Sequence, residues 1–152
     1  MTEVSGTMVT VQLVYLVLTT LWLGSMVYSL ALVQPKIARF FRDDEQREEF
    51  SVVLANGNRW PVVALIVGLL LSGGGVAFAG SGAVSVGYTV AVGLDLVAAG
   101  IFVDVSWRHW PARVFALSEE IPGFRRRLTV RATTMTVLVG VSYVVALTVS
   151  LR

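Results

Sequence analysis

The stretch VSVGYTVAVGLDLVAAGIFVDVSW, residues Val84 to Trp107, decides the fold of this chain. It is apolar for most of its length, and about 20 helical residues are enough to cross a bilayer core that is about 30 Å thick. Asp95 therefore falls near the midplane of a membrane-spanning helix. An acid at that depth costs a few kcal/mol or more, so it should face other helices or a wet cavity. We take Asp95 as the first functional candidate.

Small residues accompany Asp95 on its side of this helix. Successive residues of an α-helix are about 100° apart, so Tyr88, Ala91, Ala98 and Ala99 share the face of Asp95. Alanine lets a neighbouring helix approach closely. We expect Asp95 to point into a bundle of helices, where hydroxyl groups of the last span are its expected hydrogen-bond partners.

The second acid of the segment, Asp104, has a different expected role. It lies nine residues after Asp95, which is half a turn away around the helix and about 13.5 Å along it. The two carboxyl groups therefore cannot act as a pair. Asp104 precedes Arg108 by four residues, a favourable order for an ion pair on a helix, and we interpret it as structural.

The composition is that of an integral membrane protein. Of the 152 residues, 55% are hydrophobic and 14% are charged, whereas about 25% of the residues in soluble domains are charged. No polar segment is long enough for a second domain, so we predict one domain over residues 1–152. The chain has no cysteine, which excludes disulfides, thiol catalysis and iron–sulfur clusters.

The predicted fold is an all-α, integral membrane four-helix bundle. Its spans are expected at residues 8–33, 60–80, 84–107 and 130–150. The first span should end at Gln34, because proline disfavours a helical conformation for the residue before it. The second should begin at Trp60, with Pro61 in its first turn, and a short link should join it to the third span in a tight hairpin.

Two segments carry further patterns. Residues 36–58 alternate apolar and charged residues at helical spacing, which indicates an amphipathic helix. The simplest interpretation is a solvated helical connector; alternatively it lies in the membrane interface, extends a span into the cytoplasm, or docks a partner. The run Gly73-Gly74-Gly75 in the second span indicates either close approach to another helix or a weak, kinked segment that lines a substrate site.

Basic residues predict the orientation. Of the twelve Lys and Arg residues, five lie in the first connection, through Arg59, and six lie in the third, from Arg108 to Arg131. Positive residues gather on the cytoplasmic side of membrane proteins, so both connections are predicted to be cytoplasmic and both termini outside. We expect a multi-pass protein of a bacterial inner membrane, and we read the positive charge as a topology signal rather than as nucleic-acid binding.

Candidate sites follow from this arrangement. The candidate intramembrane polar site comprises Asp95, Tyr88, Thr20 and Tyr143. The candidate contacts with anionic lipid headgroups are Trp107, Arg108, Trp110, Arg125, Arg126 and Arg127. We expect the three consecutive arginines to set orientation and to lie outside the core.

Part of the sequence resembles a known family. The run Leu21-Trp22-Leu23-Gly24, then Gln34-Pro35, then a charged connection leading to Asn58-Arg59-Trp60, is similar to the membrane proteins grouped around the copper-resistance D membrane domain. The pattern covers about half of the chain. Those proteins carry a histidine seven residues before the tryptophan, a position that Tyr15 occupies here, so the resemblance implies the fold without the metal or haem ligand.

The residues present exclude several kinds of cofactor site and active site. A bis-histidine haem needs two imidazoles, and the chain has only His109. Met8 and Met26 are about 27 Å apart along one helix, so they cannot converge on copper. The usual enzymatic constellations do not occur, and we predict a protein that is not an enzyme and binds no cofactor. The sequence favours a structural or accessory subunit that packs against a larger membrane complex. The alternative is an oligomeric transporter or proton- or cation-coupled carrier that uses Asp95 near the midplane.

Overall fold

The computed structural model describes residues 2–109 and 119–152, and every regular element in those ranges is a helix. The elements are α1 (Thr2–Tyr28), the π-helical turn η1 (Ser29–Val33), α2 (Gln34–Phe40), α3 (Asp44–Ala79), α4 (Gly82–Asp104), the π-helical turn η2 (Val105–His109) and α6 (Ile121–Ser150). Four helical stretches are long and apolar enough to cross a membrane: Gly6–Phe40, Gln46–Ala79, Gly82–His109 and Ile121–Ser150. The prediction of an all-α bundle with four candidate spans is confirmed.

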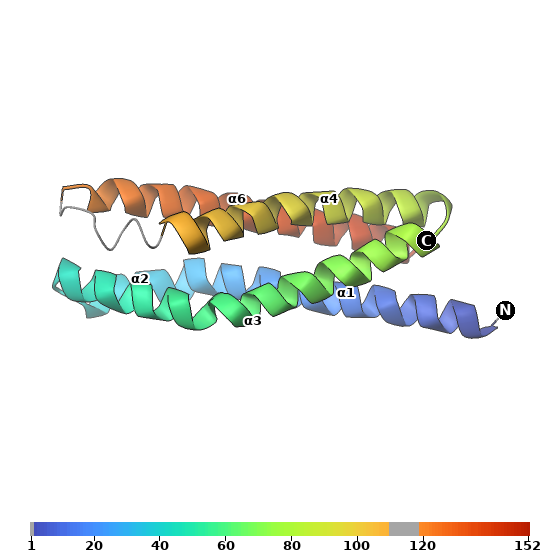
Figure 1. The fold of residues 1–152 in the computed structure, drawn as a ribbon, viewed down its shortest axis with the longest axis horizontal. Helices are drawn as coiled ribbons and strands as arrows, with labels where there is room; N and C mark the ends of the chain where they lie inside the picture. The colour runs from blue at the N-terminus through green and yellow to red at the C-terminus, as the bar shows by residue number, and fades with distance from the viewer. Residues whose placement is uncertain (1, 110–118) are drawn as a thin grey trace.

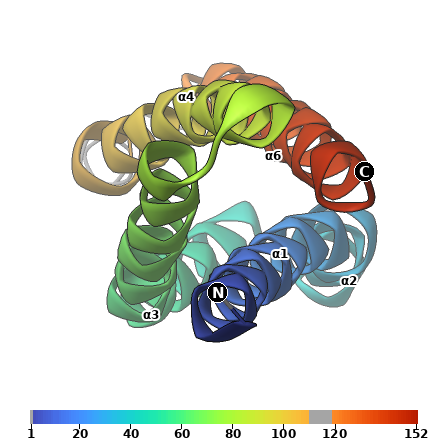
Figure 2. The same ribbon diagram turned by 90° about the vertical axis from the view of Figure 1, so that its right-hand side faces the viewer.

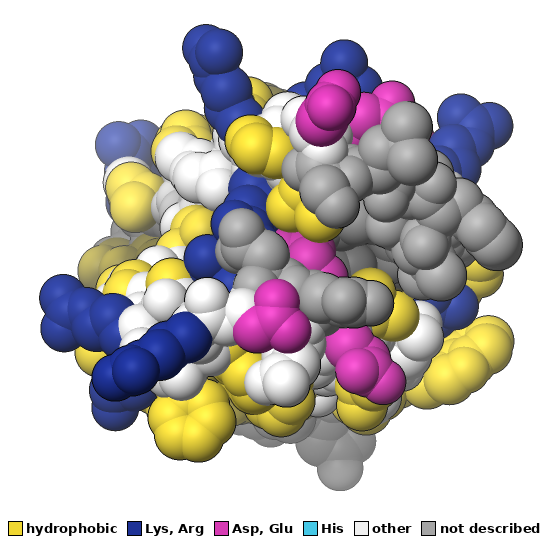
Figure 3. Space-filling view, turned by 90° about the vertical axis from the view of Figure 1, so that its left-hand side faces the viewer, with side chains coloured by type: hydrophobic (Ala, Val, Ile, Leu, Met, Phe, Trp, Pro, Cys, Tyr) yellow, Lys and Arg dark blue, Asp and Glu magenta, His cyan; other side chains and the backbone are white. Residues whose placement is uncertain are grey.

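The four long helices form a ring. Helix α1 packs against α3 and α6, and α4 also packs against α3 and α6, so α1 and α4 face each other across the interior (Figure 2). Both termini lie at one end of the bundle, and α2, the start of α3, η2 and the start of α6 lie at the other (Figure 1). We call the end opposite the termini the basic end. Figure 3 looks onto it and shows Lys and Arg side chains around the rim with acidic side chains among them.

Large apolar side chains cover the outside of the bundle. Phe78 is 95% exposed and Leu71 is 72% exposed, although both lie in a candidate span. The interior also holds polar groups, since Thr19, Asp95 and Ser142 are fully buried. A surface that is apolar around its girth and an interior that contains paired polar groups are the arrangement expected of a protein whose solvent is lipid.

Proline does not end the first helix as predicted. Gln34 keeps helical angles, φ −58° and ψ −47°, and Pro35 occupies the first turn of α2. The π-helical turn before it provides the reason, because the Gln34 N–H donates to the Ser29 carbonyl one residue further back than in an α-helix. This wider turn admits the proline ring without breaking the helix. The first span therefore continues through Phe40.

The second helix begins earlier than predicted. Helix α3 starts at Asp44 rather than Trp60, so Pro61 lies inside the helix and not in its first turn. Its 36 residues correspond to about 54 Å, well beyond the hydrocarbon thickness. The amphipathic segment 36–58 is thus made of α2 and the first part of α3. Both parts continue candidate spans, as one of the possibilities for this segment allowed.

The expected tight hairpin between α3 and α4 is confirmed. The Gly80 N–H donates to the Val76 carbonyl at 2.8 Å, and the Ser85 hydroxyl donates to the Ala77 carbonyl at 2.6 Å. Gly82 has φ +55°, a left-handed conformation that favours glycine. This turn sets α4 antiparallel to α3 and thereby fixes the direction in which Asp95 enters the interior.

Candidate functional site

Three buried side chains from three helices meet at the centre of the bundle. The Tyr15 hydroxyl donates to Asp95 Oδ2 at 2.6 Å, and the Ser142 hydroxyl donates to the same oxygen at 2.9 Å. The Tyr15 and Ser142 oxygens are themselves 2.7 Å apart. All three side chains are fully buried. We call this group the central cluster; it links α1, α4 and α6.

Tyr15 reaches Asp95 because α3 leaves room for its ring. A Cβ atom at Gly73 would lie 2.6 Å from Tyr15 Cε2 and 2.7 Å from Val92 Cγ2. Glycine is therefore required where α3 passes both α1 and α4. The next residue, Gly74, has no atom within 4 Å of such a Cβ. The glycine run thus includes one close approach between helices, one of the two roles that the sequence allowed.

The three oxygens of the central cluster allow two hydrogen-bond patterns, one with two hydrogen bonds and one with three. With an ionised carboxyl, Tyr15 and Ser142 both donate to Asp95 Oδ2, as the distances allow. With a protonated carboxyl, three hydrogens are available for three oxygen–oxygen contacts, so Asp95 donates to Ser142, Ser142 to Tyr15 and Tyr15 back to Asp95. The change between the two patterns needs only rotation of hydroxyl hydrogens. In the described part of the chain, Asp95 Oδ1 is buried with no hydrogen-bond partner.

Apolar and aromatic residues separate this cluster from the basic end. Trp22 and Met135 lie seven residues from Tyr15 and Ser142, which is two helical turns or about 10.5 Å. Trp22 is 2% exposed and Met135 is 6% exposed. Phe102 stands the same two turns from Asp95 along α4. Trp22, Phe102 and Met135, which we call the aromatic floor, also line the cavity described next.

A cavity of about 640 Å³ lies between the helices on the far side of this floor. The residues that line it come from α1, η1, α2, α3, α4, η2 and α6. Its apolar wall includes the aromatic floor together with Met26, Leu30 and Val62. Its volume falls within the range of small-molecule sites in proteins, roughly 300–1,000 Å³. The space between the helices is therefore large enough for a ligand within one chain.

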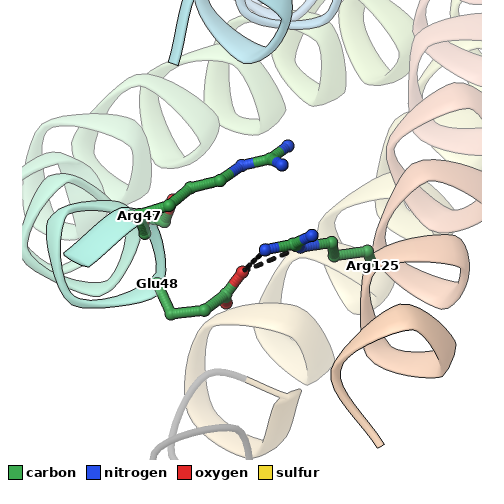
Figure 4. Close-up of polar contacts among 4 residues, drawn as sticks. Arg47, Glu48 and Arg125 are labelled. Atoms are coloured by element: carbon green, nitrogen blue, oxygen red, sulfur yellow. Dashed lines mark hydrogen bonds and ion pairs between the residues drawn. The ribbon is translucent and has the colours of Figure 1, made fainter. Parts of the chain in front are cut away.

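The mouth of the cavity is charged (Figure 4). Arg125 Nη2 lies 2.8 Å from Glu48 Oε1, and Arg125 Nε donates to the same oxygen at 2.9 Å. Arg47 extends from α3 beside this pair. Arg125 is thus an inward-facing, half-buried residue, so the prediction that it lies outside the core is wrong, whereas its contact with lipid headgroups stays a prediction. The pair joins α6 to the first part of α3.

Of the other residues predicted for the intramembrane polar site, one lies beside the central cluster and two do not take part in it. Tyr88 is buried, its ring packs edge-on against Tyr15 with centroids 5.1 Å apart, and its hydroxyl lies 2.9 Å from Ser150 Oγ. Thr20 was wrongly placed, because it is exposed and donates to the Leu16 carbonyl of its own helix. Tyr143 is half-buried and is not among the residues that hydrogen-bond Asp95.

The predicted headgroup contacts lie at the basic end. Trp107 is 42% exposed, and its ring packs near Trp60 and beneath the Arg59 guanidinium, which is 4.8 Å from its centroid. The Arg108 side chain is 86% exposed, and its Nη1 atom lies 4.0 Å from Asp104 Oδ1. Arg131 pairs more closely with the same carboxylate, with Nη1 2.9 Å from Oδ2. The exposed residues of the arginine run are Arg126 and Arg127. Trp110 lies outside the described residues.

Sequence reasoning missed Tyr15 as the partner of Asp95. The signal was present, because Tyr15 is an aromatic hydroxyl near the middle of the first span, but the sequence singled it out only as the position of the missing histidine. Ser142 does belong to the last span, from which hydroxyl partners were expected. Glu48, the partner of Arg125, was missed because its helix was assigned to a connection.

No group of three His, Cys, Asp or Glu side chains that could hold a metal ion occurs among the described residues. Comparison with known proteins gives no assignment either: no family model, no curated protein and no solved structure matches the chain. The resemblance to the copper-resistance D proteins stays a prediction. Function has to be argued from the central cluster and the cavity.

Proposed function

We propose that this protein is a proton-coupled carrier of a small solute, in which Asp95 takes up and releases the proton. The observation that carries the proposal is the geometry of the central cluster. Tyr15 and Ser142 lie 2.6 Å and 2.9 Å from one carboxyl oxygen and 2.7 Å from each other. Such a group holds a protonated and an ionised carboxyl with the same heavy-atom positions. An intramembrane acid of this kind is typical of a proton relay.

The position of the cavity supports the same proposal. It lies at the basic end, two helical turns from Asp95, and the aromatic floor stands between them. A change in the side-chain conformation of Trp22 or Phe102 would open a path from the cavity to Asp95. On the other side of Asp95, the Tyr88 and Ser150 hydroxyls form a second polar pair near the ends of α4 and α6 that face the termini. The acid thus lies between a solute cavity and a hydroxyl pair.

The orientation of the carrier is part of the proposal. Eleven of the twelve Lys and Arg residues belong to the two connections or their immediate flanks, and by the positive-inside rule this supports a cytoplasmic basic end and cavity mouth. The termini and the Tyr88–Ser150 pair then face the outside of a bacterial inner membrane. We propose no enzymatic reaction, because transfer of a proton through Asp95 changes no covalent bond of the solute.

The decisive experiment compares two acids of the same helix. Asp95→Asn keeps the size of the side chain and much of its hydrogen bonding, but it cannot carry the proton. Asp104→Asn is the matched control, since Asp104 lies at the end of α4, pairs with Arg131 and is 35% exposed at its side chain. Infrared spectra recorded over a range of pH should contain a carboxylic C=O band that titrates reversibly and disappears in Asp95→Asn alone.

Proton movement is measured in liposomes that enclose a pH-sensitive dye, with a potassium gradient and valinomycin as the driving force. The parent and Asp104→Asn should conduct protons, and Asp95→Asn should fall to the rate of protein-free liposomes. Asp95→Leu should also fail, but with a loss of stability, because the Tyr15 and Ser142 hydroxyls lose their acceptor. A folded Asp95→Asn variant that conducts like the parent would refute the carrier.

One observation favours the competing function, an accessory subunit of a larger membrane complex. Aromatic side chains crowd the tip formed by α2 and the start of α3, where Phe40 is 80% exposed and its ring centroid lies 5.1 Å from that of Phe41. In that case Asp95 serves only to hold the helices together. Asp95→Asn would then leave assembly with the complex intact, and no carboxyl band would titrate.

A further inference from the structure

The cavity at the basic end combines an apolar wall with a charged mouth. The wall is formed by the aromatic floor and aliphatic side chains of α1 and α3. The mouth carries Arg47, Glu48 and Arg125. Glu48 balances one of the two arginines through its ion pair with Arg125, so one positive charge remains among the described residues that line the mouth. A ligand that matches both parts has an apolar body and one negative charge at its end.

Arg47 supplies that uncompensated charge. In the described part of the chain its guanidinium makes no hydrogen bond or ion pair, while Arg125 beside it is held by Glu48. Figure 4 shows the Arg47 side chain extended alongside the pair, so the two guanidinium groups lie on the same side of the mouth. Guanidinium groups bind carboxylates and phosphates through paired N–H donors. The mouth is therefore arranged for an anion.

The length of the cavity limits the ligand. On α6 it extends from Arg125 to Met135, ten residues or about 15 Å along the helix. This is room for one alkyl chain of medium length. A two-chain phospholipid has twice the apolar volume and would have to leave one chain outside.

We infer that the cavity binds a single-chain anionic amphiphile, such as a medium-chain fatty carboxylate, with its head between Arg47 and Arg125 and its chain against the aromatic floor. The inference rests on the proposed carrier function, because the ligand in the cavity is taken to be the solute that the carrier transports. Such a ligand partitions into the inner leaflet and can enter at headgroup depth. It would place its chain end two helical turns from Asp95.

Binding is tested with the protein in nanodiscs of zwitterionic phosphatidylcholine. Trp22 in the floor is the reporter, in a variant with Trp60, Trp107 and Trp110 changed to Phe, and the probe is bromododecanoate, whose bromine quenches tryptophan on contact. Quenching of Trp22 should saturate with the acid. The matched alcohol, bromododecanol, and the matched cation, a bromododecyl trimethylammonium, should give only the weak, unsaturable quenching of lipid partitioning. Saturation by all three probes alike would overturn the inference.

Variants that remove one arginine charge test where the carboxylate head of the ligand binds. Arg47→Gln should weaken binding of the acid by roughly tenfold or more, as expected for loss of a charge-assisted contact. Arg126→Gln is the control, because it removes the same charge from the exposed face of α6. Calorimetry on the parent protein with decanoate and octanoate gives an independent measurement, and each methylene should add about fourfold in affinity. Equal weakening by both variants, or no dependence on chain length, would contradict the proposed site.

The two proposals fail separately. Saturable binding of the acid together with proton movement that does not depend on Asp95 would refute the carrier and leave the ligand class standing. Proton movement that depends on Asp95, together with no saturable quenching of Trp22 and no heat of binding in the parent, would refute the ligand class and leave the carrier standing.

Discussion

Replacing Gly73 with alanine should loosen the central cluster without touching Asp95. The added Cβ would meet the Tyr15 ring at 2.6 Å and Val92 at 2.7 Å, and distances under 3.0 Å are essentially never seen at real Cβ atoms. Tyr15 must therefore move, and its hydroxyl bond to Asp95 lengthens or breaks. The same change at Gly74 meets nothing within 4 Å, which makes Gly74→Ala the matched control.

The magnitude follows from two costs. Overpacking a well-filled interior costs about 1–3 kcal/mol. Loss of the Tyr15 hydrogen bond adds about 0.5–1.5 kcal/mol. Both variants gain the same helix propensity from Gly to Ala, about 1 kcal/mol, so it cancels in the comparison. Gly73→Ala should therefore be less stable than Gly74→Ala by about 1.5–4.5 kcal/mol, the sum of the two costs.

Unfolding by sodium dodecyl sulfate in mixed micelles, followed by circular dichroism, measures the two free energies. A double-mutant cycle with Tyr15→Phe then tests the cause, because a tyrosine that has already lost its hydroxyl cannot lose that bond again. The cost of Gly73→Ala should be smaller in the Tyr15→Phe background by about 0.5–1.5 kcal/mol. Equal stability of Gly73→Ala and Gly74→Ala would refute the close approach of α3 and the position given to Tyr15.

Two further predictions concern the basic end. Arg125→Gln breaks the half-buried pair with Glu48 and should reduce the free energy of unfolding by about 1–3 kcal/mol, whereas Arg126→Gln should leave it nearly unchanged; the same micelle assay decides, and equal effects would show that the pair is unimportant. Reporter fusions at Gly82 and at the C-terminus should report the outside and a fusion near Glu120 the cytoplasm, and the opposite pattern would reverse the orientation of the carrier.

The candidate site could be predicted only in part. The inward direction of Asp95 followed from the period of its own helix, because Tyr88, Ala91 and Ala98 share its face and all are buried. Its partner Tyr15 could not be found in that way, since the two residues are 80 positions apart. Their contact depends on how far each helix is rotated about its axis. Gly73, on a third helix, decides whether the tyrosine ring fits.

The sequence by itself determined that the chain forms four apolar helices with a tight hairpin between the second and third. Transfer of a residue into lipid is a local property that adds up along a segment, so composition alone identifies a span. Only the tertiary structure decided that α1 continues past Pro35, that Arg125 turns inward to Glu48, and that a cavity separates the helices at the basic end. These features depend on how side chains from distant segments fill one interior, and no single segment contains that information.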